Sequence, residues 1–134
     1  MKAKTLTVVT SMLFGIGTLC NAQQAGFKRT VLQQGDASVP SHEFVTAVAE
    51  FQPGAETGRH THPGDEIGYI LEGNVVIAQD GKPSMTLGPG KTFHIPAGTV
   101  HNATNSGSKP ARILATYVVE KGKPLATPAP ASDN

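Results

Sequence analysis

The sequence predicts an all-β protein, a small antiparallel β-barrel or sandwich formed by one domain. Short stretches rich in Val, Ile, Thr and aromatic residues recur along the chain, separated by turns of Gly, Pro, Asn and Asp. No long segment has the 3.6-residue period of an amphipathic helix. The 134 residues suffice for one hydrophobic core, and a formal net charge of +1 gives no indication of nucleic-acid binding.

The first 22 residues have the layout of a secretory signal peptide. Two lysines precede an apolar run from about Leu6 to Leu19, and small and polar residues follow up to Ala22. The run is shorter than the ~20 apolar residues that a membrane span requires, although an uncleaved N-terminal anchor is the alternative. We therefore expect removal of residues 1–22, which contain the single cysteine, Cys20, and a periplasmic or secreted protein without membrane contact.

The domain is expected to extend over residues 25–119, with its strands in chain order. A short N-terminal strand at residues 30–32 precedes a loop at 33–42, because Gly, Pro, Ser and Asp are frequent in that loop. Turn residues then separate the remaining strands, expected at residues 43–51, 66–71, 75–78, 84–87, 92–95 and 111–119. The tail at 120–134 is rich in Pro, Ala and small polar residues, which predicts disorder.

Four potential metal ligands lie around two turns. Alternate side chains of an extended strand share a face, so His60 and His62 aim at one point. A tight turn is expected at residues 63–65, and Glu66 begins the returning strand, which can bring its carboxylate beside the two imidazoles. His101 comes after a second turn at residues 96–98. Neutral imidazoles and one carboxylate suit divalent iron, manganese, nickel, copper or zinc.

The same residues belong to two longer patterns, Gly54-x5-His60-x-His62-x3-Glu66-x6-Gly73 and Gly90-x5-Pro96-x-Gly98-x2-His101-x3-Asn105. These patterns resemble both signature motifs of the cupin superfamily. The resemblance implies a double-stranded β-helix of the jelly-roll type, with one metal ion held by His60, His62, Glu66 and His101. It does not imply one chemistry, because cupins include dioxygenases, isomerases, lyases, decarboxylases, sugar binders and storage proteins.

Three functions are compatible with these residues. The first is a metal-dependent enzyme acting on a small organic molecule, such as a dioxygenase, isomerase or lyase. In such an enzyme Glu66 is the candidate catalytic residue, because it could stay a ligand or detach to move a proton. The second is a non-catalytic protein that binds a small carbohydrate or organic acid. The third is a structural cupin similar to the storage proteins, which the complete ligand set disfavours.

Side-chain alternation within residues 66–71 leads to two further expectations. Ile70 shares the parity of Glu66 and should line the pocket, whereas Ile67, Tyr69 and Leu71 share the opposite face. Apolar residues on both faces of this strand indicate that its outer face is covered as well, which favours a homodimer.

Two histidines stand apart from the ligand set. His42 is expected in a loop at the surface. His94 lies in a strand, but parity does not carry through the proline turn that separates it from His101. Two roles for His94 therefore stay open, one at the surface and one beside the metal or the substrate.

Overall fold

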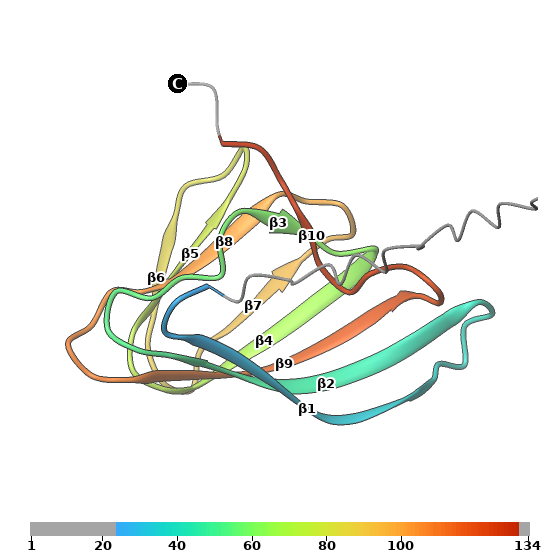
Figure 1. Ribbon diagram of the computed structural model, residues 1–134, viewed down its shortest axis with the longest axis horizontal. Coiled ribbons are helices and arrows are strands. Elements are labelled where there is room, and N and C mark those ends of the chain that lie inside the picture. Colours follow the sequence, from blue (N-terminus) through green and yellow to red (C-terminus); the bar gives the residue numbers. More distant parts are fainter. Residues whose placement is uncertain (1–23, 132–134) are drawn as a thin grey trace, which may run out of the picture.

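The computed structural model describes residues 24–131, which form two five-stranded sheets with antiparallel pairing (Figure 1). The first sheet has the order β1-β2-β9-β4-β7, with β1 Phe27–Asp36, β2 His42–Phe51, β9 Ala111–Glu120, β4 Gly64–Glu72 and β7 Thr92–Ile95. The second has the order β10-β3-β8-β5-β6, with β10 Thr127–Pro128, β3 His60–Thr61, β8 His101–Asn105, β5 Val75–Gln79 and β6 Met85–Leu87. The prediction of an all-β antiparallel jelly-roll fold is confirmed.

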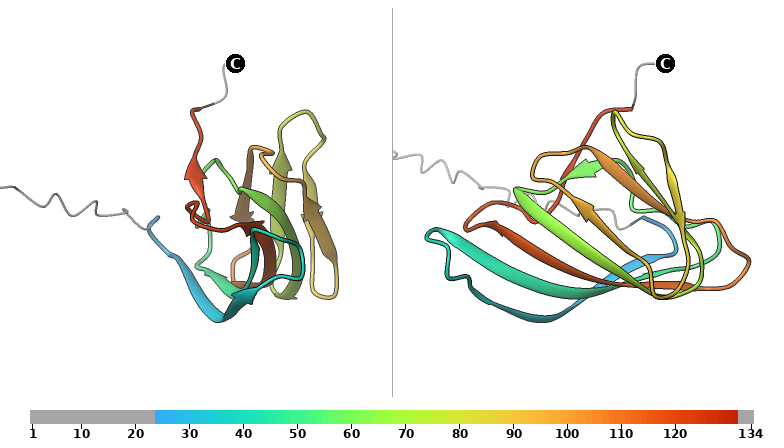
Figure 2. Two further views of the ribbon diagram at one scale, coloured as in Figure 1. Left: turned by 90° about the vertical axis from the view of Figure 1, so that its right-hand side faces the viewer. Right: turned by 180° about the vertical axis from the view of Figure 1, so that it is seen from behind.

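The hydrophobic core lies between the two sheets. Long strands β1, β2, β9 and β4 run side by side, and the shorter strands of the second sheet cross them at an angle (Figure 2). Along β4 and β9, buried residues alternate with more exposed ones, as expected for strands with one face in the core. The largest apolar side chains that are fully buried are Tyr117, Phe51, Ile70, Ile77, Ile95, Val75 and Val119.

Several boundaries differ from those predicted. β1 covers ten residues and is therefore much longer than the expected strand at 30–32. Its register with β2 shifts between Val31 and Gln33, and this irregularity interrupts the alternation that would have indicated the strand. β3 and β4 are separated only by residues 62–63, so the tight turn expected at 63–65 is shorter than predicted.

The two ends of the chain differ in how much of them the structure describes. The signal peptide predicted at residues 1–22 lies outside the described residues. Within residues 24–131, no helix is long and apolar enough to cross a membrane. The tail differs from the predicted disorder, because β10 forms there and pairs with β3. Backbone hydrogen bonds such as Ala129 N–H to Arg59 O (2.9 Å) hold this segment, and they require no hydrophobic side-chain pattern.

Close approach of β4 to β9 requires a glycine at the first residue of β4. Gly64 pairs with Val119, and a Cβ atom added to Gly64 would lie 2.0 Å from the carbonyl oxygen of Val118. A backbone atom cannot move aside as a side chain can. Gly64 therefore allows β4 to start directly against β9, two residues before Glu66.

We expect Gly64→Ala to lower the free energy of unfolding by about 3 kcal/mol or more, because the added methyl group overlaps the backbone of β9. Urea unfolding followed by circular dichroism would measure the change. Gly107→Ala is the control, since a Cβ atom there meets its nearest neighbour at 3.4 Å, and its effect should stay below about 1 kcal/mol. Equal effects of the two substitutions would contradict the role given to Gly64.

Candidate metal centre

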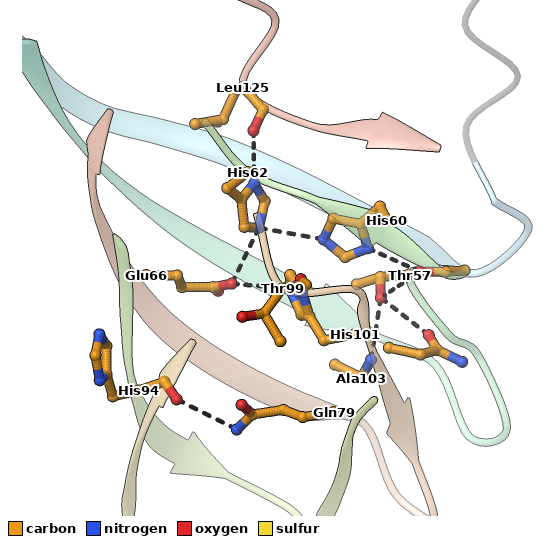
Figure 3. Close-up of polar contacts among 12 residues, drawn as sticks. Thr57, His60, His62, Glu66, Gln79, His94, Thr99, His101, Ala103 and Leu125 are labelled. Atoms are coloured by element: carbon orange, nitrogen blue, oxygen red, sulfur yellow. Dashed lines mark hydrogen bonds and ion pairs between the residues drawn. The ribbon is translucent and has the colours of Figure 1, made fainter. Parts of the chain in front are cut away.

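Four buried polar side chains from both sheets meet between the sheets (Figure 3). His60 in β3 and His101 in β8 are direct cross-strand partners in the second sheet. His62 follows β3, and Glu66 is the third residue of β4 in the first sheet. The structure therefore brings together the four residues that the sequence selected as potential ligands, each less than a tenth exposed.

Each of the three imidazoles uses Nδ1 to contact a backbone carbonyl. His60 Nδ1 lies 2.8 Å from Gly58 O, and His101 Nδ1 lies 2.9 Å from Thr99 O. His62 Nδ1 lies 2.5 Å from Leu125 O (Figure 3). A carbonyl oxygen can only accept, so each Nδ1 is the donor. A neutral imidazole has a single N–H, and these contacts therefore leave each Nε2 with a lone pair and no hydrogen.

The free Nε2 atoms converge on one another and on the carboxylate. His60 Nε2 and His62 Nε2 are 3.2 Å apart. Glu66 Oε2 lies 3.0 Å from His62 Nε2 and 3.2 Å from His101 Nε2. When all three imidazoles are neutral, these facing atoms are acceptors with no hydrogen between them, and their separations fit the spacing of donor atoms bound at ~2.1 Å around one cation. The three histidines could therefore hold a metal ion.

The electrostatics of the site point in the same direction. Burial lowers the pKa of His60 to about 4, so that its imidazole is neutral at neutral pH. Burial alone would raise the pKa of Glu66, but the hydrogen bonds that His101 and His62 donate to its carboxylate when they are protonated outweigh this effect and lower the pKa to about 2. The site thus combines neutral imidazole with an ionised carboxylate, the protonation states that metal binding requires.

Two residues outside the predicted ligand set also border the site. The ring of Tyr117 in β9 packs against His62 with 4.8 Å between ring centres. Burial, followed by the charge of Glu66, raises the pKa of Tyr117, so its side chain is a neutral phenol. Arg29 in β1 places its Cζ atom 5.6 Å from the centre of the Tyr117 ring. Tyr117 lies in the strand predicted at 111–119, whereas strand parity could have indicated Arg29 only if the bounds of β1 had been known.

Two cavities give the site its surroundings. The inner one, of about 20 Å³, borders His60, Glu66, His101 and Tyr117. The outer one, of about 510 Å³, is walled by the start of β1, by the segment before β3 and by β10. Arg29, Thr57 and His60 line both cavities. The outer cavity therefore lies directly beside the candidate ligands.

The remaining predicted residues fall outside the site. His94 is exposed on the outer surface, and its Nε2 lies 2.7 Å from Asp65 Oδ1. Of the two roles that were open for His94, the surface role is the one observed. Ile70 is buried on the same side of β4 as Glu66 and belongs to the hydrophobic core. Tyr69 is exposed on the opposite side, as predicted.

Comparisons with known proteins agree with this architecture. The sequence model of the family described as "Cupin domain" matches residues 47–117. The chain is 32% identical to the HTH-type transcriptional regulator PuuR of Escherichia coli (strain K12) over 79 residues, 58% of this chain and 42% of that protein. It is 36% identical over 67 residues to germin-like protein subfamily T member 3 of Arabidopsis thaliana, 46% of this chain and 30% of that protein. The chain thus spans less than half of these curated relatives.

One solved structure with this fold is that of an enzyme. The DMSP lyase DddQ from Ruegeria pomeroyi DSS-3 is similar to this chain with a TM-score of 0.62 and 25% sequence identity. The similarity covers 76% of this chain and 51% of that chain.

A chain that ends at Pro124 should bind divalent metal about 10- to 100-fold more weakly than the full chain. The truncation removes the Leu125 carbonyl that orients His62, and loss of such an orienting partner typically costs this factor. A chain that ends at Ala131 keeps Leu125 and β10 and serves as the control. Calorimetric titration with Zn²⁺ would compare the two, and equal affinities would contradict the orienting role of the tail.

Proposed function

Since this chain belongs to the cupin family, we propose that it is a metal-dependent enzyme acting on a small organic molecule. One observation carries the proposal: three Nε2 lone pairs and one carboxylate oxygen converge in a buried site without a hydrogen to share. A structural protein would gain nothing from this arrangement, because buried polar atoms without partners are costly. The similarity of the fold to that of a lyase adds support for catalysis.

In the proposed enzyme His60, His62 and His101 hold one divalent transition metal, and Glu66 is the fourth ligand. When bound, the metal supplies Lewis acidity and, if it is redox-active, the capacity to react with dioxygen. Dioxygenase, isomerase and lyase chemistry are each consistent with iron, manganese, copper or nickel, whereas zinc would leave the last two.

Glu66, Tyr117 and the two sheets have separate roles in the proposed reaction. The ionised carboxylate of Glu66 stays a ligand or detaches to take up a proton, which makes it the proposed catalytic residue. The neutral phenol of Tyr117 is a hydrogen-bond donor beside that carboxylate. The two sheets enclose these groups and exclude bulk water, which strengthens electrostatic interactions with a substrate.

We further propose that the enzyme is exported and forms a homodimer. The layout of residues 1–22 supports export to the periplasm or the exterior. Large apolar side chains on the outside of the first sheet support a second copy as partner. These side chains are Ile67, Tyr69 and Leu71 of β4.

We expect His62→Ala to weaken Zn²⁺ binding by more than about 100-fold, because it removes a ligand and not merely an orienting partner. Glu66→Gln keeps the shape but removes the negative charge, and should weaken binding as well. His94→Ala is the matched control and should change affinity by less than about twofold, because His94 lies on the outer surface. Equal binding by the His62 and His94 variants, both folded by circular dichroism, would refute the metal centre.

Turnover would distinguish an enzyme from a binding protein. The Fe²⁺, Mn²⁺ and Zn²⁺ forms can each be incubated with a panel of small organic acids and sugars, while an oxygen electrode and proton NMR follow the mixtures. We expect loss of at least one compound with a metal-loaded form and none after chelation. Oxygen uptake would indicate a dioxygenase, and product without oxygen uptake an isomerase or lyase. A compound that binds but persists unchanged would support the alternative, a non-catalytic binding protein.

A further inference from the structure

Arg29 is an arginine with an unsatisfied donor at the metal centre. Its Nε atom is buried, and within residues 24–131 it has no hydrogen-bond partner. The two other arginines of the chain are paired with carboxylates. Arg59 forms a two-pronged contact with Asp80 at 2.8 Å, and Arg112 Nε lies 3.8 Å from Glu50. Arg29 makes no such ion pair with any described residue, so its charge is available to a ligand.

Two aromatic rings lie near the guanidinium of Arg29. Its Cζ atom lies 5.5 Å from the centre of the Phe27 ring and 5.6 Å from that of Tyr117. Aromatic rings at this distance attract a cation, and they leave the buried Nε of Arg29 without an acceptor. Leaving a buried hydrogen-bond donor without a partner costs free energy, and the cost is larger when the donor belongs to a charged group. Such an arrangement is expected where an incoming acceptor completes it.

Arg29 lies beside the candidate metal ligands. Arg29 lines both the outer cavity and the inner cavity that reaches His60, Glu66 and His101. Tyr117 is the common neighbour of the guanidinium and of the His62 imidazole. A molecule with only a few non-hydrogen atoms that enters through the outer cavity therefore meets Arg29 and the metal ligands together.

Charge then selects the class of ligand. A divalent cation held by one carboxylate and three neutral imidazoles carries a net positive charge. Arg29 adds a second positive charge at its edge. Arg binds carboxylates with paired donors in a fixed fork, which a neutral sugar or amide cannot match.

We propose that Arg29 binds the carboxylate of a small organic acid, while a second oxygen of the same molecule faces the metal centre. This inference rests on the proposed function above, and it specifies the substrate class as anionic. It makes Arg29 a specificity-determining residue outside the metal ligand set.

Glycolate and its neutral counterpart glycolamide test the proposal, because they differ chiefly in charge. The Zn²⁺-loaded protein avoids oxygen chemistry and allows affinity to be measured by calorimetry. We expect glycolate to bind at least about tenfold more tightly than glycolamide, and Arg29→Gln to remove this preference. Arg29→Lys keeps the charge but not the fork, so it should retain part of the preference and also covers the case that Arg29→Gln fails to fold.

Lys28→Gln is the matched control, because it removes the same charge from the neighbouring, exposed residue of β1. It should leave the preference within about twofold. Equal binding of the two probes, no glycolate binding, or an unchanged preference in both Arg29 variants would overturn the role of Arg29. Failure of the wild-type protein to bind Zn²⁺ would instead refute the metal centre, so the two failures are distinguishable.

Discussion

The orientation of three imidazoles by backbone carbonyls is the constraint on which the rest of the site depends. Gly58 and Thr99 each precede their histidine by two residues, so the turn before β3 and the turn before β8 set the rings of His60 and His101 locally. The ring of His62 is set by Leu125, which lies 63 positions further along the chain. Because all three Nδ1 atoms donate outward, every Nε2 lone pair points inward. The turns before β3 and β8 and the tail at Leu125 thus orient the three imidazoles toward one point.

This arrangement has a cost that the fold must offset. Burying a carboxylate and three imidazoles between two sheets removes them from water, and their facing lone pairs give nothing back in the absence of a cation. The surrounding core offsets this cost with closely packed apolar side chains of both sheets. Gly64 contributes by letting β4 approach the backbone of β9, which places Glu66 against the histidines. Stability and site geometry are therefore coupled at the start of β4.

The sequence was most informative where side-chain pattern and function coincide. The spacing of the four ligands and the alternation of β4 predicted the centre and the buried side of Ile70, because strand parity is a local property. The role of Arg29 could not be predicted, because β1 is an edge strand with an irregular register. An edge strand has little apolar pattern by which it can be identified. β10 escaped notice because main-chain hydrogen bonds hold it, and these do not depend on residue type.

The residues that identify the family and the residues that wall the outer cavity lie in different parts of the chain. The match to the family covers residues 47–117, which include all four ligands and Tyr117 but neither β1 nor the tail. The outer cavity, by contrast, is walled largely by residues outside that range, among them Arg29, Pro128 and Ala129. The motif residues thus build the metal centre, whereas the two ends of the described chain shape the space where a ligand would lie. Apart from the backbone carbonyl of Leu125, which orients His62, the ends can differ between relatives without changing the metal ligands. The residues that select a substrate are therefore expected in these segments.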